Sequence, residues 1–563
     1  MNDFLYVVQN LHWFGLLIGA LVLFHELGHF VAARAFGVRV LRFSFGFGPR
    51  LLSVTRGDTE YRLSLLPLGG YVKMLGELPD MEVSDAERPR AFSHKPVWQR
   101  AIIALAGPAA NLLLALVVYL VMFSGTHTFG ATRLGVVTPG GPAWQAGVRP
   151  GDSIVQVDGQ AVGDWDALRD AIRFRPGEPL ALVYERNGAA HQVEVLPEAH
   201  AEADVFNEEQ TRGRIGISLQ YLKPVVAVID LSSPAAHAGV KTDDVVREVG
   251  GRKVSAWHEL RDAVAATPAG ELVRLTLERA GTQMEISLVP VGERPAGVPA
   301  ELVSSADAAW GYTGLVSKNV VVTQVEGETP ASRMGLAAGD RLLRLVSTSG
   351  EGKRVEQPIN VWELDLAAFQ GADARHAFTL TYQRGSAVHE SELHLDERSV
   401  TDEFKNRHTQ YVFGAHNDGE VIDTYLFERN VSLPEAVTVA AKQVGEDMTL
   451  IARGIGKMIS GHIPIDTMGG PIMLFVIAEK SAKRGFEFFA RMLAVISVNL
   501  GMLNLLPVPV LDGGHLLFFG IEAVRRRPAS TRTREVANAV GLALLLLLMV
   551  LVFRNDILRY VLG

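Results

Sequence analysis

The chain has 563 residues, no cysteine, a formal net charge of −8 and a mean hydropathy of +0.17. The absence of cysteine excludes disulfides, thiolate metal sites and cysteine nucleophiles, so any metal site must use His, Asp or Glu. The length allows several domains of about 100–200 residues each, and the acidic balance without a long Lys/Arg run predicts no nucleic-acid partner.

The first of four apolar stretches runs from about Leu5 to Ala33, and like the others it has the ~20 residues that a bilayer-spanning helix needs. Its N-terminal flank contains no Lys or Arg, whereas Arg34 and Arg39 follow it. This charge order is the reverse of a secretory signal peptide. We therefore expect a retained span whose N-terminus lies outside the cytoplasm.

An H-E-x-x-H motif, His25-Glu26-Leu27-Gly28-His29, interrupts this first stretch. Histidines at positions i and i+4 share one face of a helix, so both can reach one zinc ion, and the glutamate can act on a zinc-bound water. Ionisable residues in a membrane span are costly unless they face the protein interior and are paired or metal-bound. The alternative, histidines hydrogen-bonded inside a helix bundle, leaves the glutamate unexplained.

The other apolar stretches run from Ala101 to Phe123, from Phe488 to Leu506 and from Ala537 to Phe553. Basic residues are frequent between the first and second stretches and again at 525–534, between the third and fourth. The positive-inside rule places both basic loops in the cytoplasm. The N-terminus, the long middle region and the C-terminus are then expected on the other side of the membrane.

The middle region contains three similar segments, GGPAWQAGVRPGDSIVQVDGQ, SSPAAHAGVKTDDVVREVGGR and ETPASRMGLAAGDRLLRLV, which align Gly147 with Gly239 and Gly335. Short alternating strands, Gly-rich turns and one helix per unit predict three copies of a small open β-barrel. The pattern is similar to that of PDZ domains, which bind a peptide as an added strand. The alternative role for each copy is a spacer or a size filter. The second copy has Thr242-Asp243 where we align Gly-Asp in the others, which predicts a different turn there.

An amphipathic helix is predicted between the third copy and the third apolar stretch. Its apolar residues recur at spacings of four and three: Val437, Ala441, Val444, Met448, Ile451, Ile455 and Met458. We expect this helix to lie on the outer membrane surface. The alternative is that it packs on the neighbouring PDZ-like unit.

A third metal ligand is expected near the end of the third span, in the run NLLPVPVLDGGH. Two histidines need a third protein ligand, with the fourth position left for water. Asp512 is the best candidate because it lies toward the cytoplasmic end of its span, as His25 and His29 do. His515 is the rival, and an ordinary turn aspartate is the alternative to a ligand.

HELGH in the first span, AGPAANLLLA in the second and NLLPVPVLDGGH near the third resemble the site-2 protease family of intramembrane zinc metalloproteases. The resemblance is greatest to the bacterial regulator of sigma-E protease group. It implies that His25, His29 and Asp512 bind zinc and that Glu26 is the general base. One departure is that this family is expected to carry two PDZ domains or fewer, whereas this chain has three similar segments.

The same resemblance implies residues that hold the substrate, namely Asn499, Asn504, Pro507, Pro509, Gly46 and Gly48. The two glycines belong to Phe45–Pro49, which together with Tyr61–Tyr71 resembles a membrane re-entrant β-hairpin of the family. Such a hairpin would offer a strand edge to an unwinding substrate. The alternative is an ordinary cytoplasmic loop, although charge is sparse from Leu63 to Val72.

These observations predict a multi-pass α-helical membrane protein with four transmembrane helices, an extracytoplasmic array of PDZ-like α+β barrel domains and a re-entrant β-hairpin. The expected segments are a first transmembrane helix with HExxH at 1–35, a loop with the hairpin at 36–98, a second transmembrane helix at 99–124, PDZ-like units at 128–220, 221–298 and 312–397, a linker with the surface helix at 398–470, a third transmembrane helix with LDGG at 471–520 and a fourth at 535–555.

The predicted function is that of a zinc endopeptidase that cleaves single-pass proteins within the bilayer of a bacterial cytoplasmic (inner) membrane. By resemblance, the substrates are membrane anti-sigma factors already cut once on the outside, in an envelope stress response, with leftover signal peptides as a second class. The PDZ-like units would bind peptide or protein ligands. The alternatives are a membrane-anchored zinc protease for soluble proteins and a non-enzymatic membrane-anchored PDZ scaffold.

Overall fold

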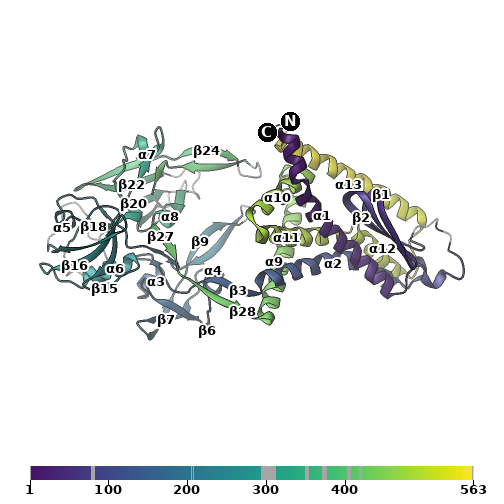
Figure 1. Ribbon diagram of the computed structural model, residues 1–563, viewed down its shortest axis with the longest axis horizontal. Helices are drawn as coiled ribbons and strands as arrows, with labels where there is room; N and C mark the ends of the chain where they lie inside the picture. The colour runs from purple at the N-terminus through teal and green to yellow at the C-terminus, as the bar shows by residue number, and fades with distance from the viewer. Residues whose placement is uncertain are drawn as a thin grey trace. The chain divides into compact units, whose positions relative to one another are not determined.

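The computed structural model describes residues 2–77, 81, 83–204, 206, 208–292, 312–348, 354–369, 377–401, 407–417, 421–560 and 562. The end of the second predicted PDZ-like unit, at 293–298, lies outside these residues, as do parts of the predicted linker. The chain divides into two compact units, one containing residues 1–127 and 430–563 and the other containing residues 128–400 and 407–429. Figure 1 labels their helices and strands in chain order.

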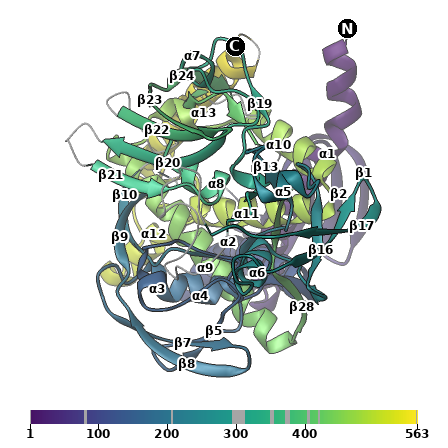
Figure 2. The same cartoon turned by 90° about the vertical axis from the view of Figure 1, so that its left-hand side faces the viewer.

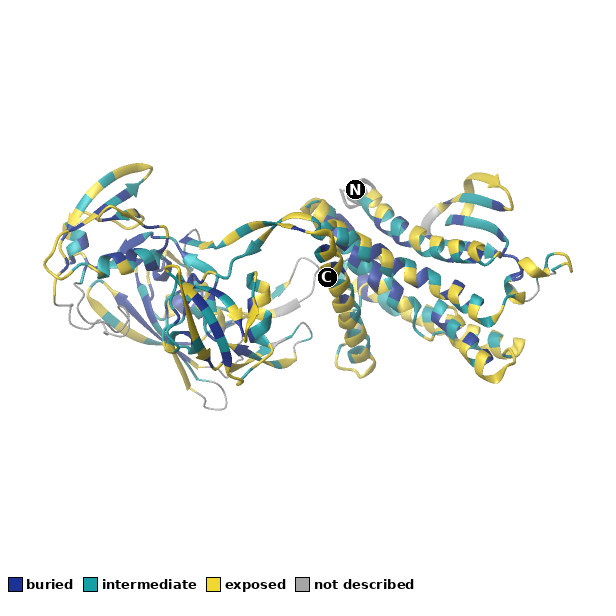
Figure 3. Cartoon of the chain, turned by 90° about the horizontal axis from the view of Figure 1, so that it is seen from below, coloured by how far each residue is buried: buried dark blue, intermediate teal, exposed yellow. Residues whose placement is uncertain are grey.

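The first unit is mainly helical. Within its described residues, four helices are long and apolar enough to cross a membrane, as the sequence predicted: α1 (Asn2–Ala35), α2 (Val97–Phe123), α11 (Phe486–Asn504) and α13 (Thr531–Tyr560). The unit also contains α9 (Leu433–Ile459), α10 (Pro471–Arg484) and α12 (Asp512–Arg525). Many large apolar side chains of α13 are exposed, among them Val540, Leu544 and Val550. Exposed apolar faces of this kind suit contact with lipid, and Figure 3 shows how buried and exposed residues alternate along the helices.

The stretch 471–520 differs from the single span that the sequence predicted. It forms three helices. Gly485, with a φ of 122°, ends α10 and separates it from α11, and a loop separates α11 from α12. Pro507 and Pro509 lie in this loop and cannot donate the backbone hydrogen bonds of a continuing helix. The LDGG motif therefore begins a new helix at Asp512.

A long antiparallel hairpin of β1 (Val40–Arg56) and β2 (Thr59–Met74) forms a two-stranded sheet in the helical unit. The register between the strands shifts repeatedly from Val40 to Leu52, which bends the hairpin. The hairpin packs on α1: a Cβ on Gly19 would lie 2.9 Å from the ring of Phe45, and a Cβ on Gly70 would lie 3.0 Å from Val22. Glycines therefore allow close contact between the first helix and the hairpin.

Helix α9 uses part of its predicted apolar face within the helical unit. Val444, Met448 and Ile451 pack in a cluster with residues of α2 and α11. The hydroxyl of the buried Tyr119 on α2 donates a 2.6 Å hydrogen bond to Asp447 of α9. This bond supplies a partner for a carboxylate that is only 8% exposed.

The second unit contains one structural motif three times, which confirms that the middle region is a repeat. The first four-stranded sheet contains β5 (Ser153–Val157), β6 (Gln160–Ala161), β7 (Leu180–Arg186) and β8 (Ala189–Val195). The second contains β14 (Val245–Val249), β15 (Arg252–Lys253), β16 (Val273–Arg279) and β17 (Thr282–Leu288). The third contains β20 (Arg341–Thr348), β21 (Arg354–Pro358), β22 (Ala377–Arg384) and β23 (Ala387–Leu393), of which Figure 2 shows the paired β20 and β22.

The helices of the three repeats also correspond. Each repeat has a one-turn helix, namely α3 (Pro142–Gln145), α5 (Pro234–His237) and α7 (Pro330–Arg333). A further helix begins at the predicted tryptophan of each repeat: α4 (Trp165–Arg173), α6 (Trp257–Ala265) and α8 (Trp362–Asp365). The first and third repeats also carry an extra antiparallel hairpin, β9 (Glu198–Ala203) with β10 (Glu209–Arg214) and β24 (Asp396–Thr401) with β25 (Arg407–Val412).

Each repeat is closed by a last strand that returns to pair with its first. These pairs are β11 (Ile217–Ser218) with β4 (Val136–Val137), β18 (Leu315–Ser317) with β13 (Val226–Val228), and β26 (Ala415–His416) with β19 (Gln324–Val325). In each repeat, the carbonyl oxygen of the residue before a positive-φ glycine accepts an equivalent backbone hydrogen bond. These bonds run from Ala143 N to Ile215 O, from Ala235 N to Thr313 O and from Ala331 N to Phe413 O. The third repeat therefore extends past the predicted boundary at 397.

The predicted difference in the turn of the second repeat is wrong. The residue equivalent to Asp152 and Asp340 is Asp244, not Asp243: each of these three aspartates is buried and pairs with an arginine at the end of a strand. Asp243 instead takes the glycine position of the turn, with a φ of 76°. Aspartate tolerates this left-handed conformation better than most residues, so the turn keeps its shape.

The stability of the second repeat should change with pH because of His258 of α6, which is 7% exposed and lies against Gly151 of the first repeat. Burial lowers the pKa of His258 to about 4. The folded state therefore holds the neutral imidazole, and stability present above pH ~6.5 should be lost as the pH falls toward 4, by roughly 1.4 kcal/mol per pH unit. Amide exchange of α6, corrected for its intrinsic pH dependence, should reveal this loss. The His258→Gln variant should flatten the profile, whereas His191→Gln, which changes an exposed histidine, should not; equal profiles in all three proteins would contradict the prediction.

Candidate metal centre

Three predicted ligands from opposite ends of the chain meet in the helical unit. Nitrogen atoms of His25 and His29 on α1 and a carboxylate oxygen of Asp512 on α12 all lie within 4.8 Å of one another. His25 Nε2 is 3.2 Å from Asp512 Oδ2, and His29 Nε2 is 3.5 Å from Asp512 Oδ1. The two Nε2 atoms are 3.3 Å apart. The rival ligand, His515, lies one turn farther along α12 and is not part of this group.

The loop before α12 turns sharply enough to bring Asp512 to the histidines. A Cβ on Gly513 would lie 2.3 Å from the carbonyl oxygens of Leu505 and Leu506, so glycine is required by the close approach of the backbone. Val510 has a φ of 89°, which is unfavourable for a β-branched residue. Strain of this kind persists where the surrounding structure imposes it, and here it lies two residues from a ligand.

Helix α12 is also fixed to α2 by a buried ion pair. Arg100 of α2 donates two hydrogen bonds to Glu522 of α12, at 2.7 and 3.3 Å, and both side chains are about nine-tenths buried. The guanidinium also lies over the ring of Phe519, 5.0 Å from its centre. A bidentate pair of this kind restricts rotation and sliding of the helix. It therefore helps to hold Asp512 at the histidines.

Helix α2 provides the groups behind both histidines. His29 Nδ1 lies 2.8 Å from the carbonyl oxygen of Ile103, which can only accept a hydrogen bond. This contact places the proton on Nδ1 and leaves the lone pair of Nε2 directed at the site. Behind His25, the amide of Asn111 lies 3.2 Å from Nδ1.

Asn111 fits the metal-binding form of His25. Its side chain is fully buried, and its Oδ1 has no hydrogen-bond partner among the described residues. Rotation of the amide by 180° places Oδ1 against His25 Nδ1, so that the protonated Nδ1 donates to it and Nε2 is free to bind a metal. Two neutral imidazoles and one carboxylate form the three-ligand set of a catalytic zinc site with an open fourth position. The donor chemistry and the orphaned amide oxygen therefore both fit zinc.

Glu26 lies between the histidines in sequence and faces the hairpin. Its carboxylate lies near the backbone of Val72 on β2. A Cβ on Gly70 would lie 3.0 Å from Glu26 Cγ, so the strand can approach only with glycine there. The hairpin therefore positions the carboxylate of Glu26 without making it a fourth ligand.

The predicted substrate residues lie in elements next to the cluster. Pro507 and Pro509 belong to the loop that leads into Asp512, and Asn499 and Asn504 lie in the second half of α11. Gly46 and Gly48 have φ values of 89° and 85° in β1, where the strand register shifts. Among the described residues, no hydrogen bond or ion pair joins Gly46, Gly48 or either asparagine to the three ligands.

Sequence reasoning missed the residues that α2 and β2 place around the cluster, namely Ile103, Gly107, Asn111, Gly70 and Val72. The AGPAAN segment supported only the family resemblance, although its Gly107 and Asn111 both contact the histidines. A Cβ on Gly107 would lie 2.3 Å from His29 Nε2 and 2.9 Å from His25 Cε1. The sequence signal for these contacts was the small Gly107 and the polar Asn111, four residues apart on an otherwise apolar helix.

The Gly107→Ala variant should therefore weaken zinc binding by about 10–100-fold, the range found when residues that orient metal ligands are changed. The added methyl group has no space unless one imidazole moves. Chelator competition on the purified protein would measure the affinity. Gly520→Ala is the matched control, because a Cβ on Gly520 of α12 has no heavy atom within 4 Å. Equal zinc affinity in both variants would show that the histidines can move away without cost.

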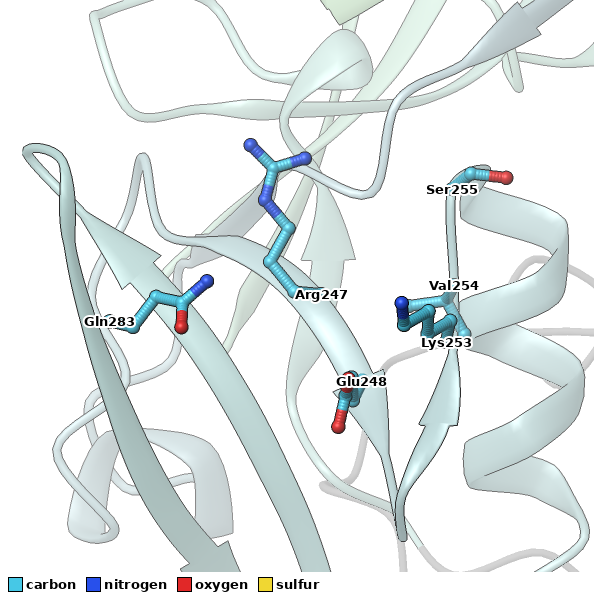
Figure 4. Close-up of a pocket in the computed structure, with 6 residues that line it drawn as sticks. All are labelled: Arg247, Glu248, Lys253, Val254, Ser255 and Gln283. Atoms are coloured by element: carbon cyan, nitrogen blue, oxygen red, sulfur yellow. The ribbon is translucent and has the colours of Figure 1, made fainter.

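A second candidate site is a pocket of about 380 Å³ on the second repeat. Figure 4 shows its lining from β14, β15 and β17, including Arg247, Glu248, Lys253 and Gln283. Arg247 already pairs with Glu278 at 2.9 Å. Small-molecule pockets are mostly apolar with a few polar groups, and this lining is mostly polar and charged. The metal centre is therefore the stronger candidate.

Two known proteins are similar to this chain over nearly its whole length. The regulator of sigma-E protease RseP of Salmonella typhimurium is 29% identical over 557 residues, covering 98% of this chain and 99% of the relative. The protein of the same name in Escherichia coli K12 is 28% identical over 546 residues, covering 96% and 97%. A solved PDZ domain of an SdrC-like protein from Listeria monocytogenes matches 16% of this chain and covers 87% of that domain, with 21% identity and a TM-score of 0.13. The model of peptidase family M50 matches residues 13–548, nearly the whole length. The chain therefore belongs to peptidase family M50.

Proposed function

We propose that this peptidase is a zinc endopeptidase of the site-2 type, which hydrolyses peptide bonds within the membrane segments of single-pass proteins. The observation that carries the proposal is the position of the cluster. Two of the proposed ligands lie on α1, a helix that is apolar and long enough to span a membrane. The third lies at the start of α12, shortly after α11, which is also long and apolar enough. A protease for soluble proteins would have its HExxH helix in a polar domain.

The mechanism assigns one task to each residue. His25, His29 and Asp512 would hold the zinc ion, which supplies Lewis-acid polarisation of the scissile carbonyl and activation of water. Glu26 takes a proton from the attacking water and passes it to the leaving amine. Ile103 and Asn111 hold the two imidazoles in the orientation and tautomer that ligation needs.

A substrate helix must unwind before its backbone can reach these groups, because its amides are used in internal hydrogen bonds. The β1–β2 hairpin is a two-stranded sheet, so each strand has an edge that an extended segment can join. We assign it the role of a re-entrant hairpin, with Gly46 and Gly48 permitting its bent course. Asn499 and Asn504 would satisfy backbone groups that the substrate exposes, and Pro507 and Pro509 keep the loop beside Asp512 from closing into helix.

The proposed location is the cytoplasmic (inner) membrane of a bacterium, with both termini and the repeats outside the cytoplasm. The distribution of Lys and Arg between the apolar helices supports this orientation. Membrane anti-sigma factors shortened by a first external cut are the proposed substrates, in agreement with the name of the Salmonella and Escherichia relatives. The PDZ-like repeats would exclude bulky external domains or bind exposed peptide ends.

Metal removal tests the proposal directly. Treatment of the purified protein with 1,10-phenanthroline should abolish cleavage of a single-pass model substrate with a short external segment, and added zinc should restore it. The same protein should leave unfolded casein intact, because a soluble chain cannot enter between the apolar helices. Cleavage of the membrane substrate by protein from which zinc has been removed would contradict the metal assignment. Efficient cleavage of casein would contradict the proposal that the protein cleaves its substrates within the membrane.

A further inference from the structure

The last strand region of the first repeat has a partner on both edges. On one edge, β11 pairs with β4, and Gly135 N donates to Ser218 O at 2.9 Å. Successive backbone groups of an extended strand point to opposite edges, so Leu219 points away from β4. On that other edge, Tyr425 N donates to Leu219 O at 3.3 Å, and β12 (Gln220–Leu222) pairs with β27 (Ile422–Thr424). Residues 421–425 of the same chain, which we call the return strand, therefore cover this edge.

The return strand lies where a PDZ-like unit would accept a peptide. Such units bind an extended segment along the free edge of the strand that follows their glycine turn, and here that turn contains Gly216, with a φ of 75°. The return strand runs antiparallel to β12, so its C-terminal end points toward Gly216. This is the direction of a peptide whose C-terminus reaches the turn.

The chain also fills the space between this edge and the neighbouring helix. A Cβ on Gly130 would lie 2.8 Å from Leu219 Cδ1 and 2.9 Å from Cβ of Trp165, the first residue of α4. The next residue, Ala131, donates its N–H to Tyr425 O at 2.8 Å. An external peptide on this edge would have to displace both segments.

Side chains hold the return strand in register. The ring of Tyr425 stacks on Tyr221 with centroids 4.3 Å apart, and the guanidinium of Arg133 lies 4.7 Å from the centre of the Tyr425 ring. Lys223 N donates to Val421 O at 2.7 Å, and Lys223 Nζ lies 3.8 Å from Asp423. Aromatic pairs across strands and cation–π contacts both stabilise such a pairing.

The other two repeats differ at the equivalent strand. Within the described parts of the chain, β18 pairs only with β13, and β26 pairs only with β19. Their second edges have no strand partner there. The three repeats therefore share one fold, but within the described residues only the first has a strand paired on this second edge.

We propose that the return strand is a built-in ligand that closes the peptide-accepting edge of the first repeat. The proposal rests on the proposed role of the repeats as acceptors of peptide strands, and it leaves that role to the second and third repeats. It also explains why the chain returns to the first repeat after completing the third. A peptide can join the first repeat only after the return strand has left.

Disulfide trapping tests the occupancy, and the absence of natural cysteines leaves only the introduced thiols. Gln220 and Thr424 lie opposite each other in a pair without direct backbone hydrogen bonds, where Cα atoms are about 4.5 Å apart and disulfides form readily. In the full-length protein, Gln220→Cys with Thr424→Cys should cross-link almost completely under mild oxidation. The offset pair Gln220→Cys with Ile422→Cys is the matched control and should remain mostly reduced. Equal yields from both pairs, or none from either, would overturn the register.

Peptide binding tests the closure. The probe is a fluorescent peptide with the sequence of residues 419–425 and a free C-terminus. A tethered strand competes at an effective concentration in the millimolar range, so the unaltered full-length protein should bind this probe at least ~10-fold more weakly than the Asp423→Pro variant, whose return strand has lost a backbone donor. Equal affinity would overturn the closure, and no binding to either protein would overturn the edge as a peptide acceptor. Neither assay depends on peptidase activity, so both remain interpretable if the proposed zinc chemistry fails.

Discussion

Glu26→Gln should lower the rate of cleavage of a membrane substrate by about 10²–10⁴-fold, the usual contribution of a general base, while zinc content stays unchanged. Glutamine has the same shape as glutamate but cannot take the proton of the attacking water. Glu26 is not one of the three grouped ligands, and its carboxylate instead contacts the backbone of Val72, so the metal should remain. Cleavage of a single-pass substrate and elemental analysis of the purified protein are the two measurements.

Glu487→Gln is the control for this variant. Glu487 also belongs to the helical unit, but it is exposed in the first turn of α11 and lies outside the ligand group. The Glu487→Gln variant should therefore cleave at the rate of the unaltered protein. An unchanged rate in Glu26→Gln would remove the general base from the mechanism, and loss of zinc from that variant would make Glu26 a ligand.

The sequence could predict the three residues of this cluster because two of them are related by local helix geometry. The spacing of His25 and His29 already fixes two imidazoles on one helix face, and Asp512 was the best third candidate because it lies toward the same end of its span. The groups behind them were not predictable in this way. The acceptor for His29 is the backbone carbonyl of Ile103, which any residue type could supply, and only the packing of α2 on α1 brings it within 2.8 Å.

The errors have physical reasons of the same kind. The apolar stretch Phe488–Leu506 corresponds to α11, but the whole segment 471–520 was expected to be one transmembrane helix. Gly485, Pro507 and Pro509 mark the places where the structure divides this segment into α10, α11 and α12. The turn of the second repeat was misaligned by one residue because a Gly-Asp pattern was sought, whereas burial identifies Asp244 as the equivalent carboxylate. The return strand was assigned to a linker because β27 has only three residues, which is too short for a strand period to be seen.

Asp512→Ala should weaken zinc binding by more than the ~10–100-fold expected when a residue behind a ligand is changed, and cleavage should be lost with the metal. The change removes one of the three proposed protein ligands. Only the two imidazoles remain, with their Nε2 atoms 3.3 Å apart, and neither has a carboxylate of α12 beside it any longer. His515→Ala is the decisive comparison, because His515 was the rival ligand but lies outside the group of three. That variant should keep its zinc, and the opposite pattern would make His515 the third ligand.

The same pair of variants connects the metal to the fold. Because the ligands come from α1 and α12, a zinc ion that binds only the folded protein stabilises the contact between the two ends of the chain. Zinc should therefore raise the melting temperature of the helical unit in the unaltered protein and in His515→Ala, but not in Asp512→Ala. A similar rise in all three proteins would mean that zinc binds at another place. Asp512 would then not be a zinc ligand, even if the Asp512→Ala variant had lost cleavage.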